Sequence, residues 1–339
     1  MKRHQNTLFI TTQGSYLSKE GECVVVHVEG SVVGKIPIHT IGNVVCFGQI
    51  NCSPFLLGHC ADNGVAISFL TENGRYMASV QGPVSGNVLL RREQYRRADC
   101  PKSSASIAQA IVAGKIANCR TVLRRSARDR ESARLTEAAD RLTMSLSSLA
   151  VALPLDTVRG IEGEAANTYF GVFNHMISEG RPSFHFTIRS RRPPLDRINC
   201  LLSFLYTLLM HDVRSALECA GLDPAVGFLH RDRPGRPSLA LDLMEEFRPY
   251  VADRLALTLV NRGQIAESGF TVSENGAVFM SDATRKSVIL AWQERKKEEV
   301  EHPFLQERMT VGLLWHMQAR LLARHLRGDL DAYPPFAMR

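Results

Sequence analysis

The stretch GPVSGN at residues 82–87 divides the chain into two parts with different sequence patterns. Before it, short runs rich in valine, isoleucine and phenylalanine are separated by glycine and asparagine, as in CVVVHVEG at residues 23–30 and NVVCFG at residues 43–48. Such runs predict β-strands joined by tight turns. After it, apolar residues recur at helical spacing and β-branched runs are rare. The two patterns therefore predict an α+β protein with two domains.

Residues 1–82 predict a small β-sandwich-like domain in which one helix, Pro54–Asp62, interrupts the strands. The sequence TENGR at residues 71–75 predicts a hairpin turn, because Asn-Gly favours type I′ geometry. We interpret residues 83–102 as a linker and residues 103–339 as a larger, all-α catalytic domain. A chain of 339 residues is long enough for two domains.

Within the helical part, two features are expected to interrupt the helices. RSRRPPLDR at residues 189–197 predicts a loop, because its two prolines stop a helix. A short hairpin is expected near residues 263–281, again with Asn-Gly at the turn. The last two helices are expected at residues 287–299 and 304–327.

Positive charge is concentrated after residue 90. The chain has 41 Lys and Arg against 34 Asp and Glu, and residues 1–90 hold five of each sign, which leaves 36 against 29 beyond them. Of the 41 basic residues 33 are arginine, whose planar guanidinium suits phosphate oxygens. This composition indicates a nucleic-acid partner. Solvated helix faces in a protein from an arginine-rich genome would explain it equally well.

The sequence indicates neither a membrane span nor secretion. No uninterrupted apolar run reaches the ~18 residues that a spanning helix needs. The first residues turn polar after a very short apolar stretch, which is not the pattern of a signal peptide. We therefore expect a cytoplasmic protein without a membrane partner.

The stretch FLHRDRPGRPSLALDLMEEFRP at residues 228–249 combines one histidine, a basic loop and clustered carboxylates. On a helix, Asp242 and Glu245 share a face, and His230 lies twelve residues before Asp242. A carboxylate on the apolar side of this helix needs a partner or a metal ion, because an unpaired buried charge is costly. Carboxylates with one imidazole suit Mn²⁺ or Mg²⁺ and could take Zn²⁺. The alternative is an amphipathic helix whose acids, near its N-terminus, complement the helix dipole.

A second cluster is GIEGEAANTYF at residues 160–170. Glu162 is flanked by glycines at the expected start of a helix, where small residues let another chain approach closely. Glu162 and Glu164 cannot both face the same way on that helix. Combined with the previous stretch, Glu162 would complete a His-plus-carboxylate site built from two helices and a loop. An acidic first turn that stabilises the helix is the alternative.

Both stretches, together with RRPPLDRINCLLSFLYTLL at residues 191–209 and AWQERKKEEVEHP at residues 291–303, resemble the CRISPR-associated integrase family Cas1. The motifs occur in the family's order, and the two-part organisation matches its plan over essentially the whole chain. The ending YPPFAMR resembles the type I-C branch. The resemblance implies a metal-dependent DNA endonuclease and integrase of CRISPR adaptation, which joins 3′-hydroxyl ends of short DNA fragments to the CRISPR repeat by transesterification.

The resemblance also implies the site residues. Glu162 matches the glutamate of a G-x-E-G element, His230 the histidine of G-F-L-H, and Glu245 the acid of D-x-x-E-x-F-R. These three would ligate Mg²⁺ or Mn²⁺. Asp242 matches the aspartate of the last element, which supports the site or joins the ligation. Glu164 and Glu246 fall outside the matched positions, so we expect both to be structural, with Glu246 an ordinary surface acid.

Arginines are the expected DNA contacts. Arg231, Arg233 and Arg236 lie in the loop beside the candidate histidine, while Arg248 could pair with the nearby glutamate or orient a phosphate. The resemblance implies double-stranded DNA as substrate, a homodimer formed through the strand-rich domain, a Cas2 dimer as partner, and a Cas4 nuclease in the type I-C branch. Two other functions stay open: a metal-dependent nuclease of branched DNA that does not integrate, and a non-catalytic nucleic-acid-binding scaffold.

Overall fold

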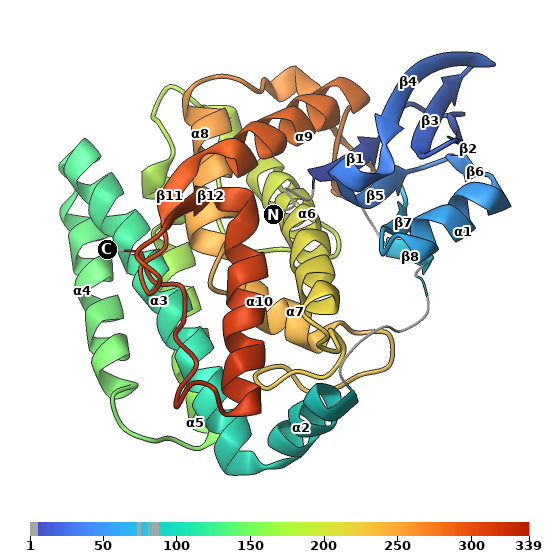
Figure 1. Ribbon diagram of the computed structural model, residues 1–339. Coiled ribbons are helices and arrows are strands. Elements are labelled where there is room, and N and C mark those ends of the chain that lie inside the picture. The colour runs from blue at the N-terminus through green and yellow to red at the C-terminus, as the bar shows by residue number, and fades with distance from the viewer. Residues whose placement is uncertain (1–5, 73–75, 81, 83–87, 339) are drawn as a thin grey trace. The chain divides into compact units, whose positions relative to one another are not determined.

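The computed structural model describes residues 6–72, 76–80, 82 and 88–338. The chain divides into two compact units, residues 1–86 and residues 87–339. Strands dominate the first unit and helices the second (Figure 1). The change from strands to helices therefore falls where the sequence pattern changes.

The N-terminal unit consists of two four-stranded sheets and one helix. Its elements are β1 (Asn6–Ile10), β2 (Tyr16–Glu20), β3 (Cys23–Val28), β4 (Ser31–Pro37), β5 (Ile41–Phe47), β6 (Asn51–Cys52), α1 (Pro54–Asp62), β7 (Ala66–Leu70) and β8 (Tyr76–Val80). One sheet has the order β1-β5-β7-β8, with β1, β5 and β7 parallel and β8 antiparallel to β7. The other has the order β4-β3-β2-β6, with only β6 parallel to its neighbour.

One apolar core joins both sheets and α1. Val44 from the first sheet, Leu17 from the second and Leu56 from α1 are all fully buried in it. Helix α1 has the predicted bounds, because Ser53 accepts a hydrogen bond from the N–H of Leu56 at 3.2 Å and Pro54 occupies the first turn. It provides the crossover that the parallel strands β5 and β7 require. The prediction of a β-sandwich-like domain did not include these parallel strand pairs. The turn predicted at residues 71–75 includes residues 73–75, which lie outside the described residues.

The C-terminal unit is built mainly from α-helices. They are α2 (Val88–Asp99), α3 (Pro101–Arg130), α4 (Ala133–Ser148), α5 (Leu155–Gly171), α6 (Arg197–Cys219), α7 (Ser238–Met244), α8 (Arg254–Asn261), α9 (Asp282–Lys297) and α10 (Val311–Arg327). Among the described residues, no helix is long and apolar enough to cross a membrane.

Helix α2 corrects the predicted linker. Most of residues 83–102 belong to α2, which is docked on the helical unit through Gln94. The Gln94 side chain is fully buried and donates to the carbonyl oxygens of Asp223 and Val226, both at 2.8 Å. Its amide oxygen accepts from the N–H of Asp223 at 2.9 Å. The sequence pattern in this segment was helical, but it did not show that Gln94 would attach the helix to the rest of the unit.

Short strands correct the all-α prediction for residues 103–339. β9 (Phe270–Val272) and β10 (Val278–Met280) form the hairpin expected near residues 263–281. β11 (Glu299–Glu301) and β12 (Arg308–Thr310) form a second hairpin that was not expected.

The second hairpin also changes the last helices. Helix α9 ends at Lys297 and α10 begins at Val311 rather than at Phe304. Pro303 interrupts the helical ladder, and Gln306 adopts a left-handed conformation with φ of 53°. These two residues turn the chain between the strands, although the apolar spacing around them is compatible with a helix.

Helix α3 organises the region where the candidate residues meet. It packs against α4, α5 and α7, and its buried face includes the polar side chains of Lys115 and Asn118. The Asn118 amide donates to the carbonyl oxygens of Glu246 at 2.7 Å and Phe336 at 2.8 Å. The helix therefore positions both the chain segment after α7 and the C-terminal residues.

Candidate active site

Asp242 fixes the position of His230. Its Oδ1 accepts hydrogen bonds from the backbone N–H of His230 at 2.9 Å and from the ring Nδ1 at 2.6 Å. Its Oδ2 accepts from the N–H groups of Phe228 at 2.6 Å and Leu229 at 2.9 Å. Asp242 is fully buried, while the His230 side chain stays 23% exposed. Because Asp242 engages Nδ1, Nε2 is the ring nitrogen that can face a ligand.

The approach of Asp242 to this loop requires Gly227. A Cβ atom at position 227 would lie 2.7 Å from Oδ2 of Asp242 and 2.9 Å from the backbone of Ser238. Two neighbours hold the loop from outside: Ser104 on α3 donates to the carbonyl oxygen of Phe228 at 3.0 Å, and Arg159 on α5 donates to that of Leu229 at 2.8 Å. The loop before His230 is therefore anchored to three helices.

Two carboxylates from different helices converge on one cation, the ammonium group of Lys115. Nζ of Lys115 contacts Oε1 of Glu162 from α5 and lies 2.7 Å from Oε2 of Glu245, which follows α7. Burial alone lowers the pKa of Lys115, but the charges of Glu245 and Glu162 outweigh it and raise the pKa above its ordinary value. The structure thus brings Glu162 and Glu245 together across 82 intervening positions in the sequence.

Arg248 balances the other oxygen of Glu245. Its guanidinium pairs with Oε1 of Glu245 and lies 4.8 Å from the centre of the Tyr206 ring. Burial raises the pKa of Glu245, but Arg248 and Lys115 lower it more, so the carboxyl group is held below its ordinary pKa. The Arg248 side chain is only 12% exposed. Of the two roles that the sequence left open for Arg248, the structure favours pairing with the acid.

A π-helix, η4 (Arg248–Asp253), supports this pairing. It begins with Arg248 and ends with Asp253, whose carboxylate accepts a hydrogen bond from the Tyr206 hydroxyl at 2.7 Å. Burial raises the pKa of Asp253 to about 6. Tyr206 therefore contacts both Arg248 and Asp253, and its ring packs against the guanidinium group that pairs with Glu245.

The alternatives that treated these acids as surface helix caps are wrong for residues 242–246. Helix α7 has only seven residues, so Asp242 lies near its C-terminal end and Glu245 at its C-cap, where negative charge opposes the helix dipole. Both carboxylates are buried. Glu162 also lies inside α5 and not at its start, because α5 begins at Leu155. Burial among partners, not capping, determines their positions.

Glu246 was expected to be a surface acid, and the structure shows the opposite. It is fully buried and accepts hydrogen bonds from the Tyr333 hydroxyl at 2.7 Å and from the N–H of Phe336 at 2.8 Å. Gln318 on α10 donates to the same carboxyl group at 3.0 Å. Burial raises the pKa of Glu246 to about 8. Glu246 therefore anchors the C-terminal residues beside the candidate site.

This raised pKa predicts a pH-dependent stability. Between the ordinary pKa of 4.5 and about 8, the unfolded chain has lost the Glu246 proton while the folded chain keeps it. The free energy of unfolding should therefore fall as pH rises through this window, by a few kcal/mol in total. Glu246→Gln should flatten that slope. Urea unfolding of both proteins at several pH values measures it, with Glu164→Gln as the control; equal slopes would contradict the assignment.

The donor chemistry of the cluster fits a divalent cation. Glu162 and Glu245 already share one cation, and His230 is oriented by a carboxylate, as metal-bound histidines commonly are. The buried Oε2 of Glu245 lies 2.7 Å from the ammonium group of Lys115, so this oxygen already faces a cation. Nowhere among the described residues, however, are three His, Cys, Asp or Glu side chains already arranged to hold a metal ion. In this structure the ammonium group of Lys115 occupies the position between the carboxylates of Glu162 and Glu245.

Lys115 is the residue that sequence reasoning missed. It belongs to none of the recognised motifs and lies in the apolar helical stretch AIVAGKIANC at residues 110–119. A lysine surrounded by apolar residues on a long helix predicts burial, and a buried ammonium requires a negative partner. That signal was present in the sequence, but nothing in it identified the partner.

The loop arginines lie outside this cluster. Arg231 and Arg233 are exposed and Arg236 is half-buried, in the loop between His230 and α7. Arg231 lies 3.6 Å from Asp156, and both side chains are more than 70% exposed, so this pair constrains it little. These three arginines remain available for phosphate groups approaching His230.

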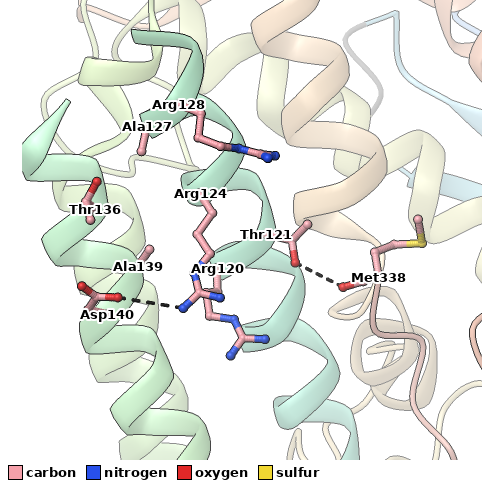
Figure 2. Close-up of a pocket in the computed structure, with 9 residues that line it drawn as sticks. All are labelled: Arg120, Thr121, Arg124, Ala127, Arg128, Thr136, Ala139, Asp140 and Met338. Atoms are coloured by element: carbon pink, nitrogen blue, oxygen red, sulfur yellow. Dashed lines mark hydrogen bonds and ion pairs between the residues drawn. The ribbon is translucent and has the colours of Figure 1, made fainter. Parts of the chain in front are cut away.

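A second basic surface lies between α3 and α4. A cavity of about 480 Å³ is lined by Arg120, Arg124 and Arg128, with Met338 at its edge (Figure 2). These arginines lie roughly 140–220° around the α3 axis from Lys115, at 100° per residue. The cavity is therefore distinct from the cluster of Glu162 and Glu245.

Known proteins resemble this chain over most or all of its length. A family model described as "CRISPR associated protein Cas1" matches residues 8–294. "CRISPR-associated endonuclease Cas1 1" of Chlorobaculum tepidum is 59% identical and covers 100% of both chains. A "CRISPR-associated exonuclease Cas4/endonuclease Cas1 fusion" of Geobacter sulfurreducens is 36% identical over 98% of this chain and 60% of its own length.

Solved structures share the fold at low sequence identity. A "Cas6-RT-Cas1--Cas2 complex" chain matches with a TM-score of 0.84 and 22% identity, over 99% of this chain and 36% of its own. A "Casposase bound to integration product" matches with a TM-score of 0.82 and 20% identity, over 99% and 95%. The fold therefore occurs in proteins whose sequences have diverged widely.

Proposed function

This chain belongs to the CRISPR-associated Cas1 family, and on that premise we propose that it is a metal-dependent DNA endonuclease and integrase of CRISPR adaptation. Its reaction would join the 3′-hydroxyl ends of short DNA fragments to the CRISPR repeat. The observation that carries the proposal is the convergence of Glu162 and Glu245 on one cation position, together with a histidine that Asp242 orients. That the related proteins are named endonucleases supports the hydrolytic half of the activity.

The proposed reaction is a phosphoryl transfer. The 3′-oxygen of the fragment attacks a phosphodiester of the repeat, its P–O bond forms as the bond to the repeat's 3′-oxygen breaks, and the leaving oxygen takes up a proton. When bound, Mg²⁺ or Mn²⁺ would stabilise charge on the phosphate and lower the pKa of the attacking hydroxyl. Glu162, His230 and Glu245 would hold it.

The chain's own residues would position these groups. Asp242 holds the proton on Nδ1 of His230 and so directs the Nε2 lone pair outward. Arg248 fixes one oxygen of Glu245. A Cβ at Gly160 or Gly163 would meet no atom within 4 Å outside its own helix backbone, so α5 has open space at these two positions.

We further propose double-stranded DNA as substrate, a homodimer, and partnership with a Cas2 dimer and a Cas4 nuclease. The name of one structural neighbour includes Cas2, and one relative is described as a Cas4/Cas1 fusion. The casposase of the same fold is described as bound to an integration product, which supports strand transfer as the reaction class.

A strand-transfer assay tests the proposal. A labelled fragment with a free 3′-hydroxyl is incubated with a supercoiled plasmid that carries the repeat, Mn²⁺, this protein and Cas2. Label joined to the plasmid is the expected result, and a fragment with a 3′-dideoxy end should give none. Cutting without joined product would favour the nuclease of branched DNA, and no metal-dependent product at all would favour a non-catalytic scaffold.

The loop arginines predict the salt dependence of DNA binding. Each phosphate contact contributes about 0.9 to the slope of log K against log salt concentration. If Arg231, Arg233 and Arg236 contact phosphates, replacing all three by glutamine should reduce that slope by roughly 2–3. Fluorescence anisotropy of a labelled duplex over a range of NaCl concentrations measures it.

The control removes the same charge elsewhere. Arg141, Arg262 and Arg320 are exposed residues of other elements, and their replacement by glutamine changes the net charge equally. This triple variant should keep nearly the wild-type slope. Equal losses in both variants would show that net charge and not the loop determines DNA binding.

A further inference from the structure

Lys115 occupies the position that the proposed metal needs. The chain has 41 basic residues, and this one is 8% exposed, with its ammonium group between two carboxylates. The Glu245 side chain that it contacts is 3% exposed, so water cannot easily replace Lys115 as a partner. The oxygens it engages, Oε1 of Glu162 and Oε2 of Glu245, belong to the proposed ligands. The proposed reaction gives Lys115 no role.

We propose that Lys115 is a resident cation of the site, which holds Glu162 and Glu245 together in the metal-free protein and which a divalent ion must displace. The inference rests on the proposed function, because it takes both glutamates as metal ligands. It extends that function by giving the site a built-in competitor for the metal. Lys115 is on this view a positioning residue in the metal-free state.

The charges of the cluster support a coupled exchange. Lys115 and Arg248 together balance Glu162 and Glu245, so the metal-free cluster is neutral. Adding a divalent cation gives the cluster an excess of two positive charges, because Lys115 is on a helix and its backbone cannot leave. An ammonium displaced from carboxylates in a largely buried site needs a new anionic partner. A DNA phosphate is such a partner, so metal and DNA should each strengthen the binding of the other.

Metal affinity without DNA tests the displacement. Lys115→Met keeps an unbranched, flexible side chain one atom shorter than lysine and removes the charge. The electron paramagnetic resonance signal of free Mn²⁺ gives the dissociation constant of the full-length protein directly. Lys115→Met should bind Mn²⁺ about tenfold more tightly than the wild type, within the range of typical coupling effects. Lys102→Met, an exposed lysine on the same helix, should bind like the wild type.

Two further variants keep the test decisive. If Lys115→Met does not fold without metal, Lys115→Gln replaces it with a shorter polar side chain, and tighter Mn²⁺ binding is again expected. Lys115→Arg retains the charge and should keep an affinity near the wild-type value. A short DNA duplex should increase the Mn²⁺ affinity of the wild type more than that of the neutral variants.

The outcomes separate this inference from the proposed function. Glu162→Gln identifies which Mn²⁺ belongs to the site. If the wild type binds no Mn²⁺ that Glu162→Gln removes, both the proposed function and the role of Lys115 are overturned. If Glu162→Gln removes Mn²⁺ but the neutral Lys115 variants bind it no more tightly than the wild type, only the role of Lys115 is overturned, and the lysine is a structural ion-pair partner.

Discussion

Glu162→Gln should reduce both cutting and strand transfer by on the order of 10³-fold or more, the range for losing the main electrostatic stabiliser of a transition state. The substitution keeps the size of the side chain and replaces a charged oxygen by an amide. The Glu162 side chain is 26% exposed, so the loss of stability should be small compared with the loss of activity. Initial rates with a labelled 3′-hydroxyl fragment and Mn²⁺ measure the effect.

Glu164→Gln is the matched control on the same helix. Glu164 is exposed and lies two residues away, so its side chain points about 200° around α5 from Glu162. Its removal should leave the rate near the wild-type value. If Glu162→Gln folds normally and keeps full metal-dependent activity, Glu162 is not a metal ligand. The proposal that the site combines residues from α5 and from the segment after α7 would then be wrong.

Asp242→Asn should have the second-largest effect, and it should reduce stability and metal affinity together. Asp242 accepts hydrogen bonds from three backbone N–H groups and from the ring Nδ1 of His230. In asparagine an NH2 group replaces one of the two carboxylate oxygens, and this group cannot accept the hydrogen bonds that the lost oxygen accepted. Leaving buried N–H groups unpaired costs about 1–3 kcal/mol each. Losing the carboxylate that orients a ligating histidine typically costs 10–100-fold in metal affinity.

Urea unfolding and Mn²⁺ titration of the same preparations measure the two effects. Asp232→Asn, in the exposed loop after His230, is the control and should change neither. If Asp242→Asn lost metal binding while its free energy of unfolding stayed at the wild-type value, Asp242 would be a metal ligand and not the support of His230.

The sequence predicted those features that local patterns specify. Strand-forming runs, the capped helix α1 and the Asn-Gly hairpin of β9 and β10 depend on neighbouring residues, and the structure contains them. The pairing of distant segments was less predictable. The parallel strands β5 and β7 and the docking of α2 by Gln94 depend on partners far along the chain.

The same distinction applies to the candidate site. Motifs placed His230, Asp242 and Glu245 close together because they are close in sequence. A shared helical face did not describe them well, since Asp242 turns to the backbone of residues 228–230 and Glu245 turns to Lys115. Glu246 looked like a surface acid because Tyr333 and Phe336, which bury it, follow almost ninety residues later. Such side-chain environments become visible only when the fold is known.

The central claim is that one divalent ion is held jointly by Glu162, His230 and Glu245. A crystal structure of the wild-type protein soaked with Mn²⁺, with anomalous scattering recorded on both sides of the manganese edge, tests it most directly. One anomalous peak should lie about 2 Å from a carboxylate oxygen of each glutamate and from Nε2 of His230, with Lys115 turned away and Asp242 still on Nδ1. A peak bound by Asp242, or none while Lys115 still joins the two glutamates, would contradict it.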